Sequence, residues 1–231
     1  MKKRVVLIML SIVMFALLGC QGSNPDAENI DNDALRFKIE HEVLNGEASP
    51  DNPERIFKEM YIPEDNPFRY VEYDEIIELL EDGTGIIYLG FPTCPWCRNF
   101  VPVLVEAAIE FGVEEILYRD ILDDRNILEL EDGEIVEVRA GDTGYYQLLE
   151  ALGDIAPEYT GLDDDSIRRI FVPTLIFVKD GEVINFQESL PSFQERVSGE
   201  ELGGWLPMND EEIAELTAIF MTYFGILFGN E

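Results

Sequence analysis

Apolar and polar residues alternate along this chain with periods that predict both helices and strands. Residues 86–91 (IIYLGF) form a short apolar run that is typical of a buried strand, and Pro92 ends it. The segment 95–111 has helical character and stops at Gly112. Between residues 73 and 80 the apolar positions recur at the spacing of one helix face: Tyr73, Ile76, Ile77 and Leu80.

Asp-Gly pairs mark two further turns, each between strand-like segments. The last predicted helix, 210–228, has Asn209 or Asp210 as its N-cap and acids in its first turn. Its C-terminal half is apolar nearly all round but too short to cross a membrane, so we expect it to pack on a sheet. The other predicted elements are helices at 34–44, 55–60 and 145–152, an edge strand at 68–71, a strand at 115–118, and hairpins at 127–138 and 174–186.

The first twenty residues have the composition of a targeting segment. A basic tip precedes an apolar run, which is the shape of a secretory signal. The run ends in Leu17-Leu18-Gly19-Cys20, which resembles the lipobox of bacterial lipoproteins. That resemblance implies a signal peptide at 1–19, a lipid on Cys20 and an extracytoplasmic protein anchored to the bacterial membrane. An ordinary signal peptide and an uncleaved anchor are the alternatives.

The segments that follow differ in composition from the rest of the chain. Residues 20–33 are polar and contain Pro25, so we expect a flexible tether from the lipid. Residues 34–67 are rich in proline and are expected to form an N-terminal extension. The remaining chain, 68–231, carries the alternating helix and strand pattern of an α/β domain.

The charge of the chain restricts its partners. It has 48 acidic and 16 basic residues, a formal net charge of −32. Nucleic acid is therefore not an expected partner, because its phosphates would be repelled. A cationic substrate would be attracted, although the acids also serve simply to keep a surface soluble.

Two of the three cysteines lie together where the strand at 86–91 meets the next helix. A bridge between Cys94 and Cys97 closes too small a loop to stabilise the fold, so a chemical role is favoured. Ahead of a helix N-terminus, Cys94 is placed to react as a thiolate, and Cys97, one turn on, can resolve a mixed disulfide. Pro95 suits the first helical position, and Trp96 offers an apolar face to a substrate chain.

A metal site is the alternative for the cysteine pair, but structural zinc needs four ligands. His41 is the only histidine of the sequence, and we expect it on the surface of the helix at 34–44. We therefore predict neither a metal nor another bound cofactor.

The cysteine segment FPTCPWCRNFVPVL resembles the thioredoxin-fold family, in which a proline lies at the position of Pro102. The segment 168–183 (RRIFVPTLIFVKDGEV) resembles the part of thioredoxins that closes the active-site groove. By that match Pro173 is the cis-proline, and Val172 and Thr174 shape the groove beside it.

The resemblance implies an α/β fold: a three-layer α/β/α sandwich with a mixed central sheet. It covers 68–231, with an insertion at about 124–165 before the cis-proline hairpin. The stretch GIIYLGFPTCPWCRNFVPVL most resembles Gram-positive, membrane-associated thioredoxin-like proteins of the bacteriocin accessory type. One departure is Tyr88, which stands where thioredoxins carry a buried aspartate, so Asp120 is a candidate substitute.

The expected function is thiol–disulfide exchange, with protein or peptide thiols and disulfides as substrates and a membrane protein as redox partner. Reduction, oxidation and isomerisation use the same residues, so the direction stays open. The alternative is a redox-inert peptide-binding or chaperone-like module on the same scaffold.

Overall fold

The computed structural model describes residues 31–229. The predicted signal sequence at 1–19, the predicted lipid-attachment residue Cys20 and most of the tether at 20–33 lie outside the described residues. Within residues 31–229, a central sheet of five strands organises the chain. These strands are β3 (Phe68–Tyr70), β4 (Gly85–Gly90), β5 (Ile116–Asp120), β8 (Thr174–Lys179) and β9 (Glu182–Gln187).

The sheet is mixed, and its strand order is β3-β5-β4-β8-β9. Strands β3, β5 and β4 run parallel, whereas β8 is antiparallel to both β4 and β9. The predicted edge position of β3 is confirmed. The C-terminal ends of β4, β5 and β9 and the N-terminal end of β8 lie at the same end of the sheet. The segments that follow β4, β5 and β9 are therefore near the segment that precedes β8.

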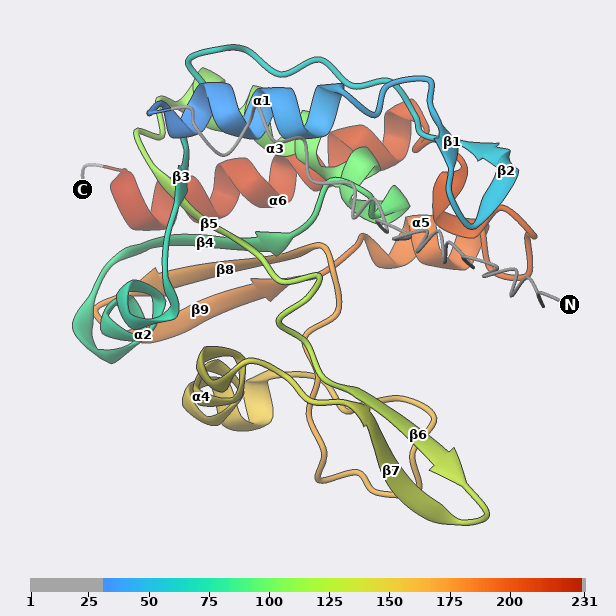
Figure 1. Cartoon of the computed structure of the whole chain (residues 1–231). Helices are drawn as coiled ribbons and strands as arrows, with labels where there is room; N and C mark the ends of the chain where they lie inside the picture. The colour runs from blue at the N-terminus through green and yellow to red at the C-terminus, as the bar shows by residue number, and fades with distance from the viewer. Residues whose placement is uncertain (1–30, 230–231) are drawn as a thin grey trace, which may run out of the picture.

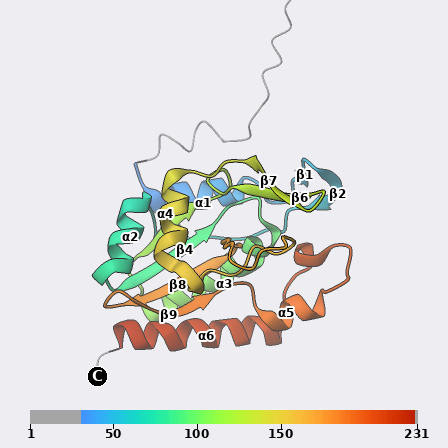
Figure 2. The ribbon, with the colours of Figure 1, turned by 90° about the horizontal axis from the view of Figure 1, so that it is seen from below.

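Helices cover both faces of the sheet, so the expected three-layer α/β/α arrangement is confirmed (Figures 1 and 2). One face carries α1 (Asp33–Glu42), α3 (Pro95–Phe111) and α6 (Asp210–Phe228). The other carries α2 (Tyr73–Asp82) and α4 (Thr143–Leu152).

Strand β4 divides its side chains between the two cores by the period of two that strands impose. Ile86 and Tyr88 point into the core beneath α1, α3 and α6. Ile87 and Leu89 point into the core beneath α2 and α4. Burial on both faces explains why the run that predicted this strand is continuously apolar.

Helices α3 and α6 have the bounds expected from the sequence, because local signals fix their ends. Gly112 ends α3 in the left-handed conformation (φ 86°) that glycine adopts readily. Asn209 and Glu212 form a capping box at the start of α6. As expected, α6 packs against the sheet, and its side chains Phe220 and Phe224 are buried. Neither α6 nor any other helix in residues 31–229 is long and apolar enough to cross a membrane.

The N-terminal extension differs from the prediction at one element. The expected short helix at 55–60 is wrong: β2 (Asn52–Ile56) pairs there with β1 (Ala48–Ser49) as a small antiparallel sheet. The main-chain N–H of Phe57 donates to the Glu47 carbonyl at 2.9 Å, which closes this hairpin. Pairing with a neighbouring segment has overridden the local helical preference.

The segment predicted as an insertion, 124–165, lies below the sheet in Figure 1, and its helix α4 packs into the core on that face. Its hairpin of β6 (Ile127–Glu131) and β7 (Glu134–Arg139) confirms the Asp-Gly prediction. It continues into α4 and a single 3-10 turn (Gly153–Ile155). Near the C-terminus, α5 (Pro191–Arg196) and a second 3-10 turn (Gly203–Trp205) were not expected from the sequence.

His41 corrects a second prediction, because it lies in the core and not on the surface. Its side chain is fully buried, and its ring lies 4.0 Å from that of Phe37. The ring Nδ1 lies 2.8 Å from the Phe37 carbonyl oxygen. Burial lowers the pKa of His41 to about 3, so the ring is neutral at pH 7. The two aromatic rings, one helical turn apart, form the inner face of α1.

Arg98, the residue after Cys97, joins the N-terminal extension to α3. Its side chain is fully buried. The guanidinium donates to the carbonyls of Lys58 (2.6 and 2.9 Å), His41 (2.9 Å) and Pro92 (3.3 Å), and to Asn45 Oδ1 (2.5 Å). No carboxylate of the described residues forms an ion pair with it. Burial lowers the pKa of Arg98 to about 10, so it remains charged at neutral pH.

We expect Arg98→Met to lower the free energy of unfolding by about 2–4 kcal/mol, because several buried acceptors lose their donors together. Arg69→Met is the matched control, since Arg69 makes two ion pairs at the surface and should cost less than about 1 kcal/mol. Urea unfolding of both variants measures the difference. Equal losses for the two arginines would contradict the role assigned to Arg98.

Candidate redox site

Cys94 and Cys97 occupy the start of α3, at the end of β4. Cys94 is the N-cap residue, and its Sγ accepts a hydrogen bond from the Cys97 backbone N–H at 3.2 Å. Pro95 takes the first helical position, where no backbone N–H is needed. The helix start therefore directs a free N–H group at the first sulfur, as the sequence predicted.

The predicted proline loop lies against this sulfur. The Val172–Pro173 peptide bond is cis. The Cys94 thiol donates to the Val172 carbonyl, with 3.7 Å between sulfur and oxygen. The antiparallel pairing of β4 with β8 produces this approach, because it sets the end of one strand beside the start of the other.

The two thiols differ in access and in acidity. Cys94 is 4% exposed and lines a cavity, whereas Cys97 is fully buried. Burial alone would raise the pKa of Cys94, but hydrogen bonds from Cys97 and the Trp96 backbone, together with the charge of Arg125, hold it below the usual value. Burial, and then Cys94 itself, raise the pKa of Cys97 well above that value. Cys94 thus borders the cavity with a lowered pKa, whereas Cys97 is enclosed with a raised pKa.

The cavity beside Cys94 has a volume of about 1080 Å³. Four more of the predicted site residues line it: Pro95, Trp96, Val172 and Pro173. Thr174 does not; its side chain is buried and its hydroxyl donates to the Phe171 carbonyl, so it shapes the loop from behind. The space is large enough for several residues of a peptide.

Trp96 is a fixed wall of this cavity. Its ring meets that of Phe193 of α5 edge-on, at 5.1 Å between centroids. The ring also lies against Gly204, where an added Cβ would come within 2.6 Å of the indole nitrogen. Gly204 therefore permits the ring to seat itself close to the backbone.

The insertion forms another wall, which the sequence did not indicate. Arg125, Asp154 and Glu158 of this segment line the cavity together with Cys94, Arg168 lines it from just beyond the segment, and Glu188 lines it from the segment after β9. The sequence marks these residues only as ordinary charges in a charged chain. Nothing in a linear pattern shows that the insertion folds back onto the cysteines.

Tyr88 lies behind the buried sulfur. Its hydroxyl reaches over Gly90, where an added Cβ would overlap it, and it is buried without a hydrogen-bond partner of normal length. Burial, and then the proximity of Cys97, raise the pKa of Tyr88 far above the usual value. A phenol thus adjoins Cys97 where a carboxylate was the expected feature of the fold.

Asp120, the substitute suggested by the sequence, lies beside Gly90 in the sheet register. Burial raises the pKa of Asp120 to about 6, and its carboxylate accepts the N–H of Leu122 at 2.9 Å. The carboxylate therefore serves the turn after β5.

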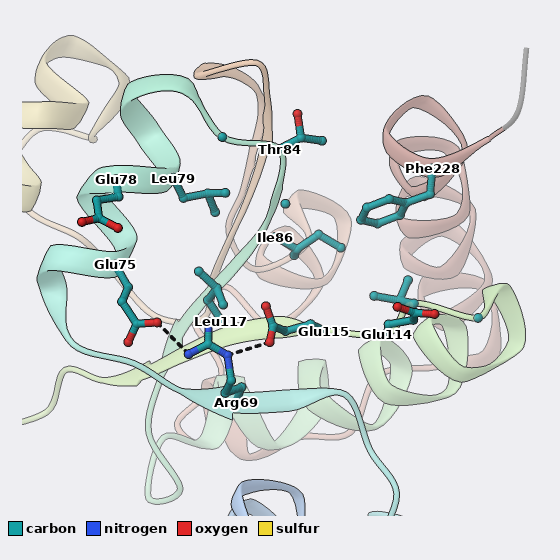
Figure 3. Close-up of a pocket in the computed structure, with 14 residues that line it drawn as sticks. Arg69, Glu75, Glu78, Leu79, Thr84, Ile86, Glu114, Glu115, Leu117 and Phe228 are labelled. Atoms are coloured by element: carbon teal, nitrogen blue, oxygen red, sulfur yellow. Dashed lines mark hydrogen bonds and ion pairs between the residues drawn. The ribbon is translucent and has the colours of Figure 1, made fainter.

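A second cavity, of about 660 Å³, lies at the opposite end of the sheet, near the starts of β4 and β5 (Figure 3). Arg69 is bound there by Glu75 at 2.7 Å and Glu115 at 2.6 Å. Because Arg69 is already ion-paired and no cysteine is among the described residues that line this cavity, we place the candidate redox site at the first cavity. Within residues 31–229, no cluster of three or more potential metal-ligating side chains occurs.

Comparison with known proteins gives little further information. No protein-family model matches the chain. No curated protein matches it. Among solved structures, thioredoxin O2 from Arabidopsis thaliana in the oxidized state is similar over 60% of this chain and 96% of that one, with 17% identity and a TM-score of 0.33. We therefore base the site on the geometry of its own residues.

We expect an alkylating reagent to label Cys94 and leave Cys97 unmodified in the reduced, folded protein. The labelling rate should rise with pH around a midpoint below the ordinary cysteine pKa of about 8.5, because the thiolate is the reactive form. Mass spectrometry of digested samples over a pH series measures both sites. Denatured protein, in which both cysteines should react alike, is the control.

Tyr88→Phe should slow the resolution of a mixed disulfide at Cys94 by about 3- to 10-fold, because loss of the hydroxyl raises the pKa of Cys97 further. Labelling of Cys94 should change little. Tyr118→Phe is the control, since its hydroxyl is also buried without a partner. Rapid-quench kinetics distinguish the two, and equal slowing would contradict a specific effect of Tyr88.

Proposed function

We propose that this protein is a thiol–disulfide oxidoreductase that acts on protein or peptide substrates. The observation that carries the proposal is the asymmetry of the cysteine pair. Cys94 faces a peptide-sized cavity with a lowered pKa, whereas Cys97 is buried with a raised one. Cysteines that only fill a core are not expected to differ in this way in access and in pKa.

The chemistry follows from the positions of the two sulfurs. In the reducing direction the Cys94 thiolate attacks one sulfur of a substrate disulfide, forms a mixed disulfide and releases one substrate thiolate. The Cys97 thiolate then attacks Cys94 Sγ and releases the second. Two electrons pass to the substrate, two protons complete its thiols, and a Cys94–Cys97 disulfide remains. A dithiol partner, which we propose to be membrane-bound, would restore the reduced state.

We also propose an extracytoplasmic location with a lipid on Cys20. The support is the lipobox-like end of the apolar run at 1–19. The polar segment 20–33 would then tether an N-terminal extension (34–67) and a catalytic domain (68–231, with its insertion at about 124–165).

Cys94→Ser should abolish exchange with a disulfide peptide, because removal of a nucleophile costs orders of magnitude in rate. Cys97→Ser should instead accumulate a mixed disulfide at Cys94, because the resolving thiol is gone. Turnover of a fluorogenic disulfide peptide and non-reducing gels measure the two effects. Unchanged exchange in Cys94→Ser would refute the role of Cys94, and exchange no faster than the uncatalysed background in the unsubstituted protein would favour the redox-inert binding module.

The reduction potential of the pair, measured against thiol buffers, determines the direction. A value near thioredoxin's, about −270 mV, would favour a reductase, whereas one near about −120 mV would favour an oxidase.

A further inference from the structure

The cavity beside Cys94 contains a cation, Arg125, that no acid of residues 31–229 neutralises. The Arg125 Nε is buried without a hydrogen-bond partner. The guanidinium forms no ion pair with any acid in residues 31–229. It lies 5.0 Å above the Phe91 ring, which fixes it near the end of β4. In a chain with 48 acidic residues, an unpaired and partly buried arginine is unexpected.

Glu188 is the opposite charge in the same cavity, and it is unpaired as well. It follows directly after β9 and forms no ion pair within the described part of the chain. Burial raises the pKa of Glu188, and no neighbouring cation offsets that effect. A carboxylate held in this way gains from an external cation.

The other charged residues of the cavity already bind one another. Arg168 contacts Asp154 at 2.8 Å and Glu158 at 4.0 Å. Among the charged residues that line the cavity, Arg125 and Glu188 are the two that have no ion-pair partner in the described part of the chain. The cavity therefore has one available charge of each sign.

The strand order puts the segment that carries Cys94 between the segments that carry these two charges. In the order β5-β4-β8-β9, Arg125 belongs to the β5 side and Glu188 to the β9 side. Cys94 follows β4 and Pro173 precedes β8, in the middle of the same edge. A peptide that crosses the cavity through Cys94 meets Arg125 on one side and Glu188 on the other.

We propose that the cavity selects peptide substrates with a carboxylate on one side of the reacting cysteine and a basic side chain on the other. This inference rests on the proposed function and adds its substrate class. Arg125 binds the carboxylate, with a planar fork of N–H groups that donates to both of its oxygens. Glu188 binds the basic group.

The electrostatic contrast with the whole molecule makes the inference specific. A net charge of −32 attracts any cation and repels any acid, so it would favour basic peptides in general. Contacts in a partly desolvated cavity are screened less than that long-range field. A dipolar peptide satisfies both unpaired charges, whereas a purely basic one leaves Arg125 without a partner.

The test uses the full chain in detergent and four fluorogenic disulfide peptides with blocked termini. Two carry Asp and Lys on either side of the cysteine, in opposite orders; one carries Asn and Gln, and one Lys twice. We expect kcat/KM for one dipolar order to exceed that for each of the other three by about tenfold, which equals 1.4 kcal/mol. A neutral peptide with a free C-terminal carboxylate tests whether a chain terminus replaces Asp.

The charge of Arg125 also lowers the pKa of Cys94, so a change at Arg125 alters the reaction rate with every peptide. This common effect cancels in the ratio of kcat/KM between two peptides, which therefore measures selectivity. Arg125→Met should remove the discrimination at the acidic position, and Glu188→Gln that at the basic position. Arg125→Lys keeps the charge without the fork and should retain part of it. Arg69→Met, at the opposite end of the sheet and outside this cavity, is the control that should leave the ratios unchanged.

Equal kcat/KM for all four peptides, or ratios unaffected by both Arg125→Met and Glu188→Gln, would overturn the proposal. Turnover of the neutral peptide tests the proposed function separately. If no peptide is turned over, binding of the same sequences with serine in place of cysteine still measures the charge preference. Selective binding without turnover would then retain the charge selection and reject the enzyme.

Discussion

The hydrogen bonds of the buried Arg98 guanidinium are the interactions on which the site most depends. A charge inside a protein requires hydrogen-bond partners, and the partners here are carbonyls of the N-terminal extension and of the segment before Cys94. Cys97, the residue before Arg98, is thereby held where the N-terminal extension, α3 and β4 meet. The extension belongs to the support of the candidate site, although it precedes the first strand of the central sheet.

The edge of the sheet then determines what surrounds Cys94. The antiparallel pairing of β8 with β4 delivers Pro173 to one side of the sulfur. The parallel pairing of β5 with β4 delivers the insertion to the other, and Arg125 with it. The reactive sulfur is therefore set by the helix start, while its surroundings come from segments distant in sequence. Reactivity and selectivity have separate structural origins.

Elements with local signals could be predicted from the sequence, and elements that depend on distant contacts could not. Gly112 and the Asn209 capping box fix the ends of α3 and α6. The CPWC and VPT segments indicated which residues meet. The position of His41 was predicted wrongly because its polar sequence neighbours suggest a surface helix. Its burial results from tertiary packing of α1, which the local sequence does not show. The charged wall of the cavity was not predicted, because the periodicity of a sequence does not show how an inserted segment packs against the cysteines.

The charge of the chain shows the same difference between global and local properties. Net charge governs solubility and long-range attraction, and it led to the expectation of cationic substrates. At Cys94 the unpaired charge that acts on the sulfur is instead the cation Arg125, which helps to lower the pKa of the thiol. Because screening weakens distant charges faster than buried neighbours, this arginine influences the chemistry more than the many surface acids do. Selectivity at Cys94 must therefore be judged from its cavity.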